Sequence, residues 1–241
     1  TLGGTLTGTI TSGSSAVTIS GVTYTKAETG VVLTATGSVA GNVNGKVGDS
    51  NAFTVVAGAA DATASTLTPS SASIVADGST TQVLTVTAKD ANGNNLTAGG
   101  ATVTITKSSG TGSISSVTDN SNGTYSATVT SPTAVGSGVF VATLGASQVK
   151  SGTGSQTQST ITYIAGTASK LVVSTIAGQT AGTAFAVTVT LTDVNGNPVN
   201  ATADGTVTLT RKTGTGTLGG TLTGTITSGS SAVTISGVTY T

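Results

Sequence analysis

The segment TLGGTLTGTITSGSSAVTISGVTYT, which opens this chain at positions 1–25, occurs again without a change at positions 217–241. The offset between the two copies is therefore 217 − 1 = 216. Such a repeat constrains the fold, because the same local sequence has to fit equivalent positions of a periodic protein. We therefore interpret the chain as an internal piece of a longer protein, spanning slightly more than one period.

A second, weaker sequence repeat has half of this offset. The segments AFTVVAG and TITYIAG end at Gly58 and Gly166, an offset of 166 − 58 = 108, and twice 108 is 216. The period therefore holds two domains of equal length. We expect residues 59–166 to be one complete domain, residues 167–241 to be the N-terminal part of a second type, and residues 1–58 to be the C-terminal part of that second type from the preceding repeat.

The apolar residues alternate with small polar ones, as in VLTVTAK (83–89), TYSATVT (124–130) and FAVTVTLT (185–192). Alternation with a period of two indicates strands with one buried face, and Val, Ile and Thr fit a pleated surface. Asn-Gly and Asp-Gly pairs between these segments are typical of tight turns. Short strands in units of about 100 residues predict an all-β chain of tandem immunoglobulin-like β-sandwich domains without helices.

Composition argues against several classes of function. The chain has 8 basic residues (Lys and Arg) and 8 acidic residues (Asp and Glu). Only 7% of its residues are charged, against about 25% in an average domain. We expect no nucleic-acid partner without a basic patch, and no membrane insertion without an apolar run of about 18 residues. The chain has no Cys and no His, and its few acids fall mostly in predicted turns. We therefore expect it not to be an enzyme.

A family resemblance follows from motifs in residues 59–166, which contain an ADGS turn, a DANGN hairpin and an NGTY strand start. This segment resembles the bacterial immunoglobulin-like domains of the invasin and intimin type, and it is similar to filamin-type repeats. The second domain type resembles them more loosely, through AGTAFAVTVTLTDVNGNPV. The resemblance implies tandem modules of a surface adhesin or fibre, located extracellularly or at the cell surface, in which most modules are spacers.

One cation site is a candidate. The segment DVNGN places Asp193, Asn195 and Asn197 at alternate positions, as at the start of a calcium loop, and Asp204 occupies the twelfth position. An ordinary hairpin turn explains the same pattern and is the reading we favour. We expect no cofactor, with calcium at these four residues as the alternative, and rigidity that comes from short apolar linkers.

Three segments fit the acceptor pattern for N-glycosylation. They begin at Asn95, Asn122 and Asn200, and all three lie in predicted turns. A chain rich in Thr also matches this pattern by chance. The three segments are therefore either glycosylation sites or chance matches.

The sequence as a whole predicts a non-catalytic structural repeat segment of a long extracellular fibre or surface stalk. One alternative is an adhesin module that recognises a host or cell-wall ligand. Another is a subunit of a laterally assembled surface layer, paired through exposed edge strands. The expected partners are neighbouring immunoglobulin-like domains of the same protein and other copies of the chain in a filament.

Overall fold

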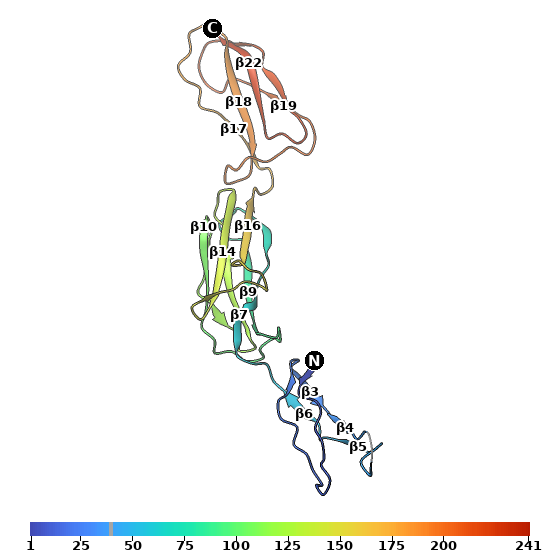
Figure 1. Cartoon of the computed structure of the whole chain (residues 1–241). Helices are drawn as coiled ribbons and strands as arrows, with labels where there is room; N and C mark the ends of the chain where they lie inside the picture. Colours follow the sequence, from blue (N-terminus) through green and yellow to red (C-terminus); the bar gives the residue numbers. More distant parts are fainter. Residues whose placement is uncertain (39–40) are drawn as a thin grey trace.

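The structure is a computed structural model that describes residues 1–38 and 41–241. Figure 1 shows three bodies in a row: an N-terminal body (2–55), a central body (60–164) and a C-terminal body (170–240). The described residues form strands, turns and loops and no helix, which confirms the predicted all-β fold. No membrane-spanning helix is therefore present in this part of the chain.

The central body is a sandwich of two sheets. Its strands are β7 (Ala60–Thr68), β8 (Ser71–Val75), β9 (Thr81–Asp90), β10 (Val103–Gly110), β11 (Ser113–Ile114), β12 (Thr118–Asp119), β13 (Thr124–Thr130), β14 (Gly136–Leu144), β15 (Ser147–Gln148) and β16 (Gln158–Ile164). One sheet has the order β11-β13-β9-β7, with β12 beside β13, and the other has the order β10-β14-β16-β8, with β15 beside β14. Neighbouring strands are antiparallel except β16 and β8, which are parallel.

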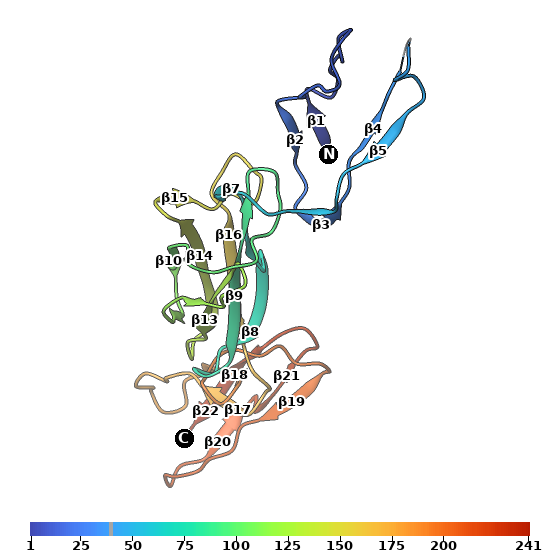
Figure 2. The ribbon, with the colours of Figure 1, turned by 90° about the horizontal axis from the view of Figure 1, so that it is seen from below.

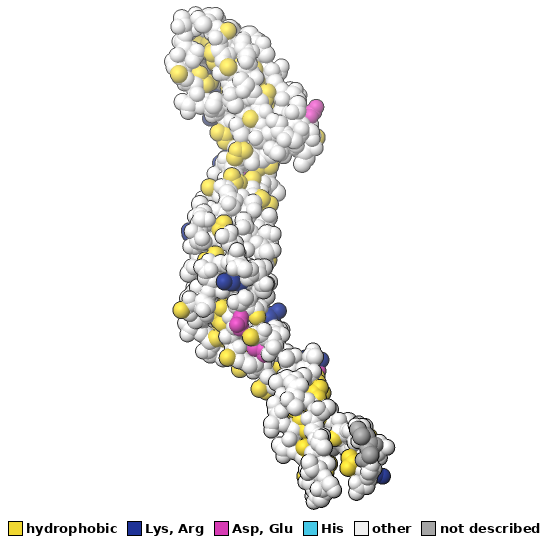
Figure 3. All heavy atoms as spheres, in the orientation of Figure 1, with side chains coloured by type: hydrophobic (Ala, Val, Ile, Leu, Met, Phe, Trp, Pro, Cys, Tyr) yellow, Lys and Arg dark blue, Asp and Glu magenta, His cyan; other side chains and the backbone are white. Residues whose placement is uncertain are grey.

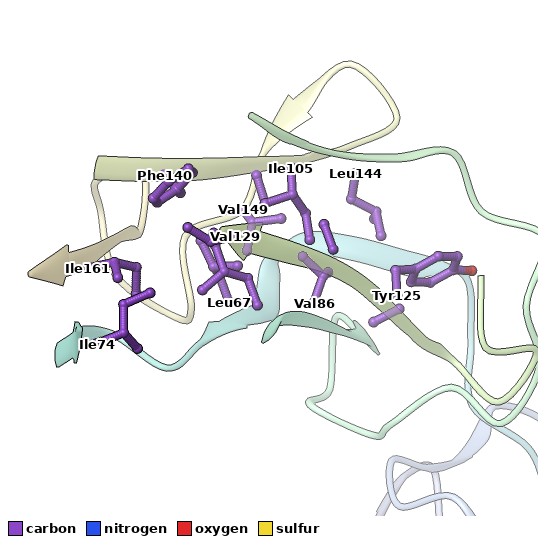
Figure 4. Packing of buried hydrophobic residues seen from close by; sticks show 14 of the residues in the cluster. Leu67, Ile74, Val86, Ile105, Tyr125, Val129, Phe140, Leu144, Val149 and Ile161 are labelled. Atoms are coloured by element: carbon purple, nitrogen blue, oxygen red, sulfur yellow. The ribbon is translucent and has the colours of Figure 1, made fainter. Parts of the chain in front are cut away.

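The alternating sequence produces the core of this sandwich. In β9, Leu84, Val86 and Ala88 are fully buried, whereas the side chains between them are partly exposed. Figure 4 shows side chains of both sheets meeting in one layer, with Phe140 on β14 facing Val129 on β13. Burying one such side chain contributes about 1.5–3 kcal/mol, so this layer holds the two sheets together.

The C-terminal body repeats one of these sheets and has a smaller core. Its strands are β17 (Lys170–Val173), β18 (Phe185–Thr192), β19 (Gly205–Thr208), β20 (Leu218–Gly220), β21 (Thr223–Ile226) and β22 (Ala232–Tyr240). The order β17-β18-β22-β20 corresponds to β7-β9-β13-β11, while β19 pairs with β21 in a separate two-stranded sheet. The buried residues of its core are Val187, Val189, Val207, Ile226, Ile235 and Val238.

The N-terminal body consists of three two-stranded sheets and lacks a comparable core in its described residues. Its strands are β1 (Leu2–Gly4), β2 (Val22–Tyr24), β3 (Glu28–Val31), β4 (Thr34–Thr36), β5 (Val47–Asp49) and β6 (Phe53–Val55). The pairs are β1-β2, β3-β6 and β4-β5. Figure 2 shows the β1-β2 and β4-β5 ribbons extending away from the central body, and Figure 3 shows apolar side chains at the surface here. Val31 is the buried hydrophobic residue among the described residues of this body.

The central core predicts how neighbouring substitutions differ. Leu84→Ala should lower the free energy of unfolding of the central body by about 2–5 kcal/mol, because it leaves a cavity between the sheets. Val83→Ala is the matched control, since Val83 is 47% exposed, and it should change stability by less than about 0.5 kcal/mol. Amide hydrogen exchange in β9 and β13 measures both values. Equal effects of the two substitutions would contradict this description of the core.

Candidate functional site at the domain junctions

A hairpin turn directly after β18 places a buried carboxylate at the junction between the central and C-terminal bodies. Asp193 is 1% exposed. Its carboxylate accepts hydrogen bonds from the backbone amides of Asn195 and Asn197 and from the side-chain amide of Asn197, each at 2.9 Å. The fourth donor is the amide of Gly166 in the linker, at 3.0 Å. The turn needs a left-handed residue, which Gly196 supplies with φ of 89°.

The side chain of Asn197 connects this hairpin to the central body. Its Nδ2 donates to the carbonyl oxygen of Thr133 at 2.9 Å, and its Oδ1 accepts from the amide of Val135 at 3.1 Å. Asn195 adds a hydrogen bond from its Nδ2 to the carbonyl oxygen of Ala76, at 3.2 Å. We call Asp193, Asn197 and Gly166 the second junction clamp, because they tie the hairpin, the linker and a loop of the preceding body together.

The first junction contains the same arrangement at the end of β9. Asp90 is 3% exposed and its carboxylate accepts from the backbone amides of Asn92 and Asn94, each at 2.9 Å. The side-chain amide of Asn94 donates at 2.8 Å, and the linker amide of Gly58 donates at 2.9 Å. Asp90, Asn94 and Gly58 form the first junction clamp.

The two clamps hold equivalent loops of the preceding bodies. Asn94 Nδ2 donates to the carbonyl oxygen of Thr25, and Asn94 Oδ1 accepts from the amide of Ala27, both at 2.9 Å. The corresponding partners in the second clamp are Thr133 and Val135, at an offset of 133 − 25 = 108 along the chain. The linker glycines have the same offset. One set of contacts thus occurs twice in the chain, at the offset that separates the two linker glycines.

Hydrogen bonding lowers the pKa of both clamp carboxyls. The side-chain amide of Asn197 has the largest effect on the pKa of Asp193 and holds it at about 2, although burial opposes the shift. Asn94 does the same for Asp90, whose pKa is also about 2. N–H groups favour the ionised carboxyl, so both residues carry a negative charge that the surrounding amides stabilise.

A hollow of about 410 Å³ adjoins the second clamp and contains a second acid, Asp77. The carboxylate of Asp77 accepts from the hydroxyl of Thr80 at 2.6 Å, the amides of Ser79 and Thr80, and the hydroxyl of Ser131. These hydrogen bonds hold the pKa of Asp77 below its usual range, and the bond from the Thr80 hydroxyl has the largest effect. The two acids of this hollow therefore have their oxygens directed to hydrogen-bond donors.

The candidate calcium ligands are divided between two turns. Asp193, Asn195 and Asn197 lie in the clamp hairpin, where Asp193 accepts four hydrogen bonds. Asp204 lies in an exposed turn before β19, and its carboxylate accepts from the amide of Ser228 at 2.8 Å. Across residues 1–38 and 41–241, no three acidic, His or Cys residues gather in one place.

The three candidate glycosylation sites are exposed. Asn95 follows the first clamp hairpin and Asn200 follows the second. Asn122 lies in the turn between β12 and β13, and its side-chain oxygen accepts from the amide and hydroxyl of Thr124. Their modification stays a prediction.

Sequence reasoning identified the clamp hairpins as turns and missed their role between bodies. The pattern DxNGN occurs twice, at Asp90 and at Asp193, each time a similar distance after a linker glycine. This shared position relative to the linker is the sequence signal that points to a role at the junction. The partner atoms in the preceding body are backbone groups, which carry no side-chain signature in the sequence.

A comparison with family models agrees with this architecture. Residues 61–166 match the model for invasin, domain 3. The match covers the central body, which is therefore similar in sequence to domain 3 of invasin. A search of the curated proteins finds no match.

Several solved structures of surface proteins are similar. The Yersinia pseudotuberculosis adhesin InvE is 24% identical, with a TM-score of 0.41, over 75% of this chain and 52% of that chain. Invasin, a bacterial integrin-binding protein, is 21% identical, with a TM-score of 0.47, over 90% and 41%. The Escherichia coli adhesin FdeC is 26% identical, with a TM-score of 0.42, over 82% and 62%. The chain thus spans between 41% and 62% of these structures.

The second clamp predicts a local effect of Asn197→Ala. The substitution removes the acceptor of the Val135 amide and a donor to Asp193, which should weaken the junction by about 1–3 kcal/mol. The Val135 amide should then exchange its hydrogen roughly 5- to 150-fold faster. Asn200→Ala is the matched control, because Asn200 is exposed near the same hairpin. Unchanged exchange at Val135 in Asn197→Ala would contradict the clamp.

The clamp carboxyls also predict a pH dependence. Their pKa is about 2 in the folded state, below the usual value of about 3.9, so the stabilisation is complete above about pH 4 and is lost as the pH falls toward 2. The NMR shifts of the Gly58 and Gly166 amides should titrate with midpoints near pH 2. Asp193→Asn should abolish the titration at Gly166 and leave that at Gly58. Midpoints at or above pH 4 would overturn the prediction.

Proposed function

We propose that this chain is a non-catalytic structural segment of a cell-surface stalk, in which modules follow one another at a fixed spacing. The observation that carries the proposal is the repeated junction clamp. Each clamp fixes the linker and the adjoining loop with a buried, fully hydrogen-bonded carboxylate. When every junction has the same contacts, each module is held in the same way relative to the next. The distance between the two ends of the chain of modules is then fixed, which is the property that a spacer needs.

The repeat organisation belongs to this proposal. Residues 59–166 are one complete module, and residues 1–58 and 167–241 are two parts of a second module type within one sequence period. The strand registers support this division. Glu28 of β3 lies opposite Val55 of β6, and Gly136 of β14 lies opposite Tyr163 of β16, with the same offset of 108 for both partners. The β3-β6 pair is therefore the counterpart of β14-β16.

Rigidity in this proposal does not depend on calcium. About six to eight oxygen ligands surround a bound calcium ion, usually with several carboxylates. The clamp carboxylates instead receive N–H groups, which occupy the oxygens that a cation would need. The linkers between the bodies are short and rich in Ala and Gly, as in VAGAA after β6.

The rival function is an adhesin module, and the similarity to adhesin domains is what favours it. Such a module binds through exposed loops or edge strands, where aromatic and Arg side chains contribute most of the energy. The chain has 4 Tyr, 3 Phe and no Trp, and Tyr125, Tyr163 and Phe140 are buried in the central core. These residues are unavailable to a ligand, so we rank adhesion second.

Proteins with one, two and four sequence periods in series test the proposal. In electron micrographs they should form straight rods whose length increases by a constant step per period, in calcium and equally in excess chelator. Bent or collapsed particles would contradict the stalk. A fall of more than about 10 °C in melting temperature on chelation would reveal a structural metal, since about 1 kcal/mol shifts a domain by only a few degrees. Saturable binding of one period to host cells or cell walls would favour the adhesin.

A further inference from the structure

The hydrogen bonds from the two clamp hairpins to the preceding bodies end on backbone atoms throughout the described residues. The side chain of Asn94 pairs with the carbonyl oxygen of Thr25 and the amide of Ala27. The side chain of Asn197 pairs with the equivalent two groups of the loop 133–135. A carboxamide has a donor side and an acceptor side, which match a carbonyl and an amide two residues apart. The hairpin therefore recognises the backbone of the loop.

The two loops that the clamps hold differ in their side chains. At the offset of 108, Lys26 has Ala134 as its counterpart and Glu28 has Gly136. The first loop thus carries an ion pair between Lys26 and Glu28, whereas residues 132–136 carry no charged side chain. The four bonds to the Asn side chains are nevertheless 2.9 to 3.1 Å long in both loops. The contact is therefore the same with and without charges in the loop.

The clamps also form over different lengths of chain. Gly58 lies 32 residues before Asp90, and Gly166 lies 27 residues before Asp193. The central body forms β7, β8 and β9 over this length, and the C-terminal body forms β17 and β18. A Cβ added at either glycine would still lie 3.6 Å from the Oδ2 and 3.7 Å from the Cβ of the clamp acid. The linker therefore passes the hairpin in the same way in two modules of different construction.

We propose that the clamp hairpin is a general connector, which joins its module to a preceding module of either type. Its partner is a loop that presents a carbonyl oxygen and an amide two residues further on, in a module that ends with the linker glycine. Two module types can follow one another in four orders, and the junctions at Gly58 and Gly166 represent two of them. The inference rests on the proposed stalk, because the same clamps carry both.

A junction between two copies of residues 59–166 has every group that the clamp needs. The linker amide is that of Gly166, which meets Asp90 of the following copy. The loop is 133–135, whose carbonyl and amide meet the side chain of Asn94 in the following copy. A stalk of this kind therefore lengthens by duplication of a single module, without a matching change in its neighbours.

A full chain with one extra module tests the connector. Residues 59–166 are inserted a second time directly after Gly166, and the inserted copy carries Val135→Ala, which mimics Ala27 of the first loop. The Val135 that remains then lies in the new junction, and isotope-labelled valine allows its amide to be followed by hydrogen exchange. This amide should exchange at the rate that it has in the unaltered chain, within about twofold.

Substitutions in the inserted copy alone provide the matched controls. Asn94→Ala removes the acceptor of the Val135 amide, which should then exchange at least about fivefold faster. Asn95→Ala should leave the exchange unchanged, because Asn95 is an exposed residue next to Asn94.

A substitution of the loop tests its side chains in a chain of the ordinary length. Ala134→Lys with Val135→Ala gives the second loop the sequence Thr-Lys-Ala of the first. The amide at position 135 should keep its exchange rate within about twofold, since the backbone groups that Asn197 contacts are unchanged.

The outcomes separate the connector from the stalk. Exchange of the Val135 amide in the extended chain at the rate of the Asn94→Ala control would overturn the connector and leave the stalk standing, because the junctions in their ordinary order would still be clamped. Loss of protection in the loop variant would also overturn the connector. Unprotected Val135 in the unaltered chain would overturn both proposals.

Discussion

The need to cover one apolar face of each sheet governs this structure. The two hairpin copies show the constraint directly, because the same residues form the same hairpin whether or not a partner is present. Where β18 and β19 lie against the hairpin, its alternating Ile and Val become a core, and where they are missing the strands shorten. Local propensity therefore supplies the turn and the register, while burial supplies the extended sheet.

At the junctions the stabilising contacts are hydrogen bonds rather than apolar packing. Asp90 and Asp193 are buried there, and a buried charge without hydrogen-bond partners is costly. The carboxylate of Asp90 or Asp193 satisfies the linker glycine and its own turn at once. Among the described residues, no buried side-chain nitrogen or oxygen is left without a partner. The clamp therefore ties the linker to the hairpin through hydrogen bonds.

The sequence was sufficient for the all-β fold because alternation and Asn-Gly turns act locally, as β9 and its hairpin illustrate. The linker glycines Gly58 and Gly166 have the same offset as the loops that the two clamps hold, so the positions of the clamps follow the sequence repeat. The sequence was insufficient for the clamp, whose partners at Thr25 and Thr133 are backbone groups brought close only by the packing of two bodies. The spacing of a calcium loop also suggested that Asp204 lies beside Asp193. In the structure Asp204 lies in a separate turn, where its carboxylate accepts from the amide of Ser228.

Completion of a sandwich and order at its junction are coupled in this architecture. The loop that the first clamp holds, at Thr25 and Ala27, connects β2 to β3 and so joins the two layers of one module. The corresponding loop at Thr133 and Val135 connects β13 to β14 in the central body and is held by Asn197 in the same way. Stability in such a row consists of module terms and junction terms, and the clamp loops take part in both, because each joins two strands of its own module and bonds the hairpin of the next.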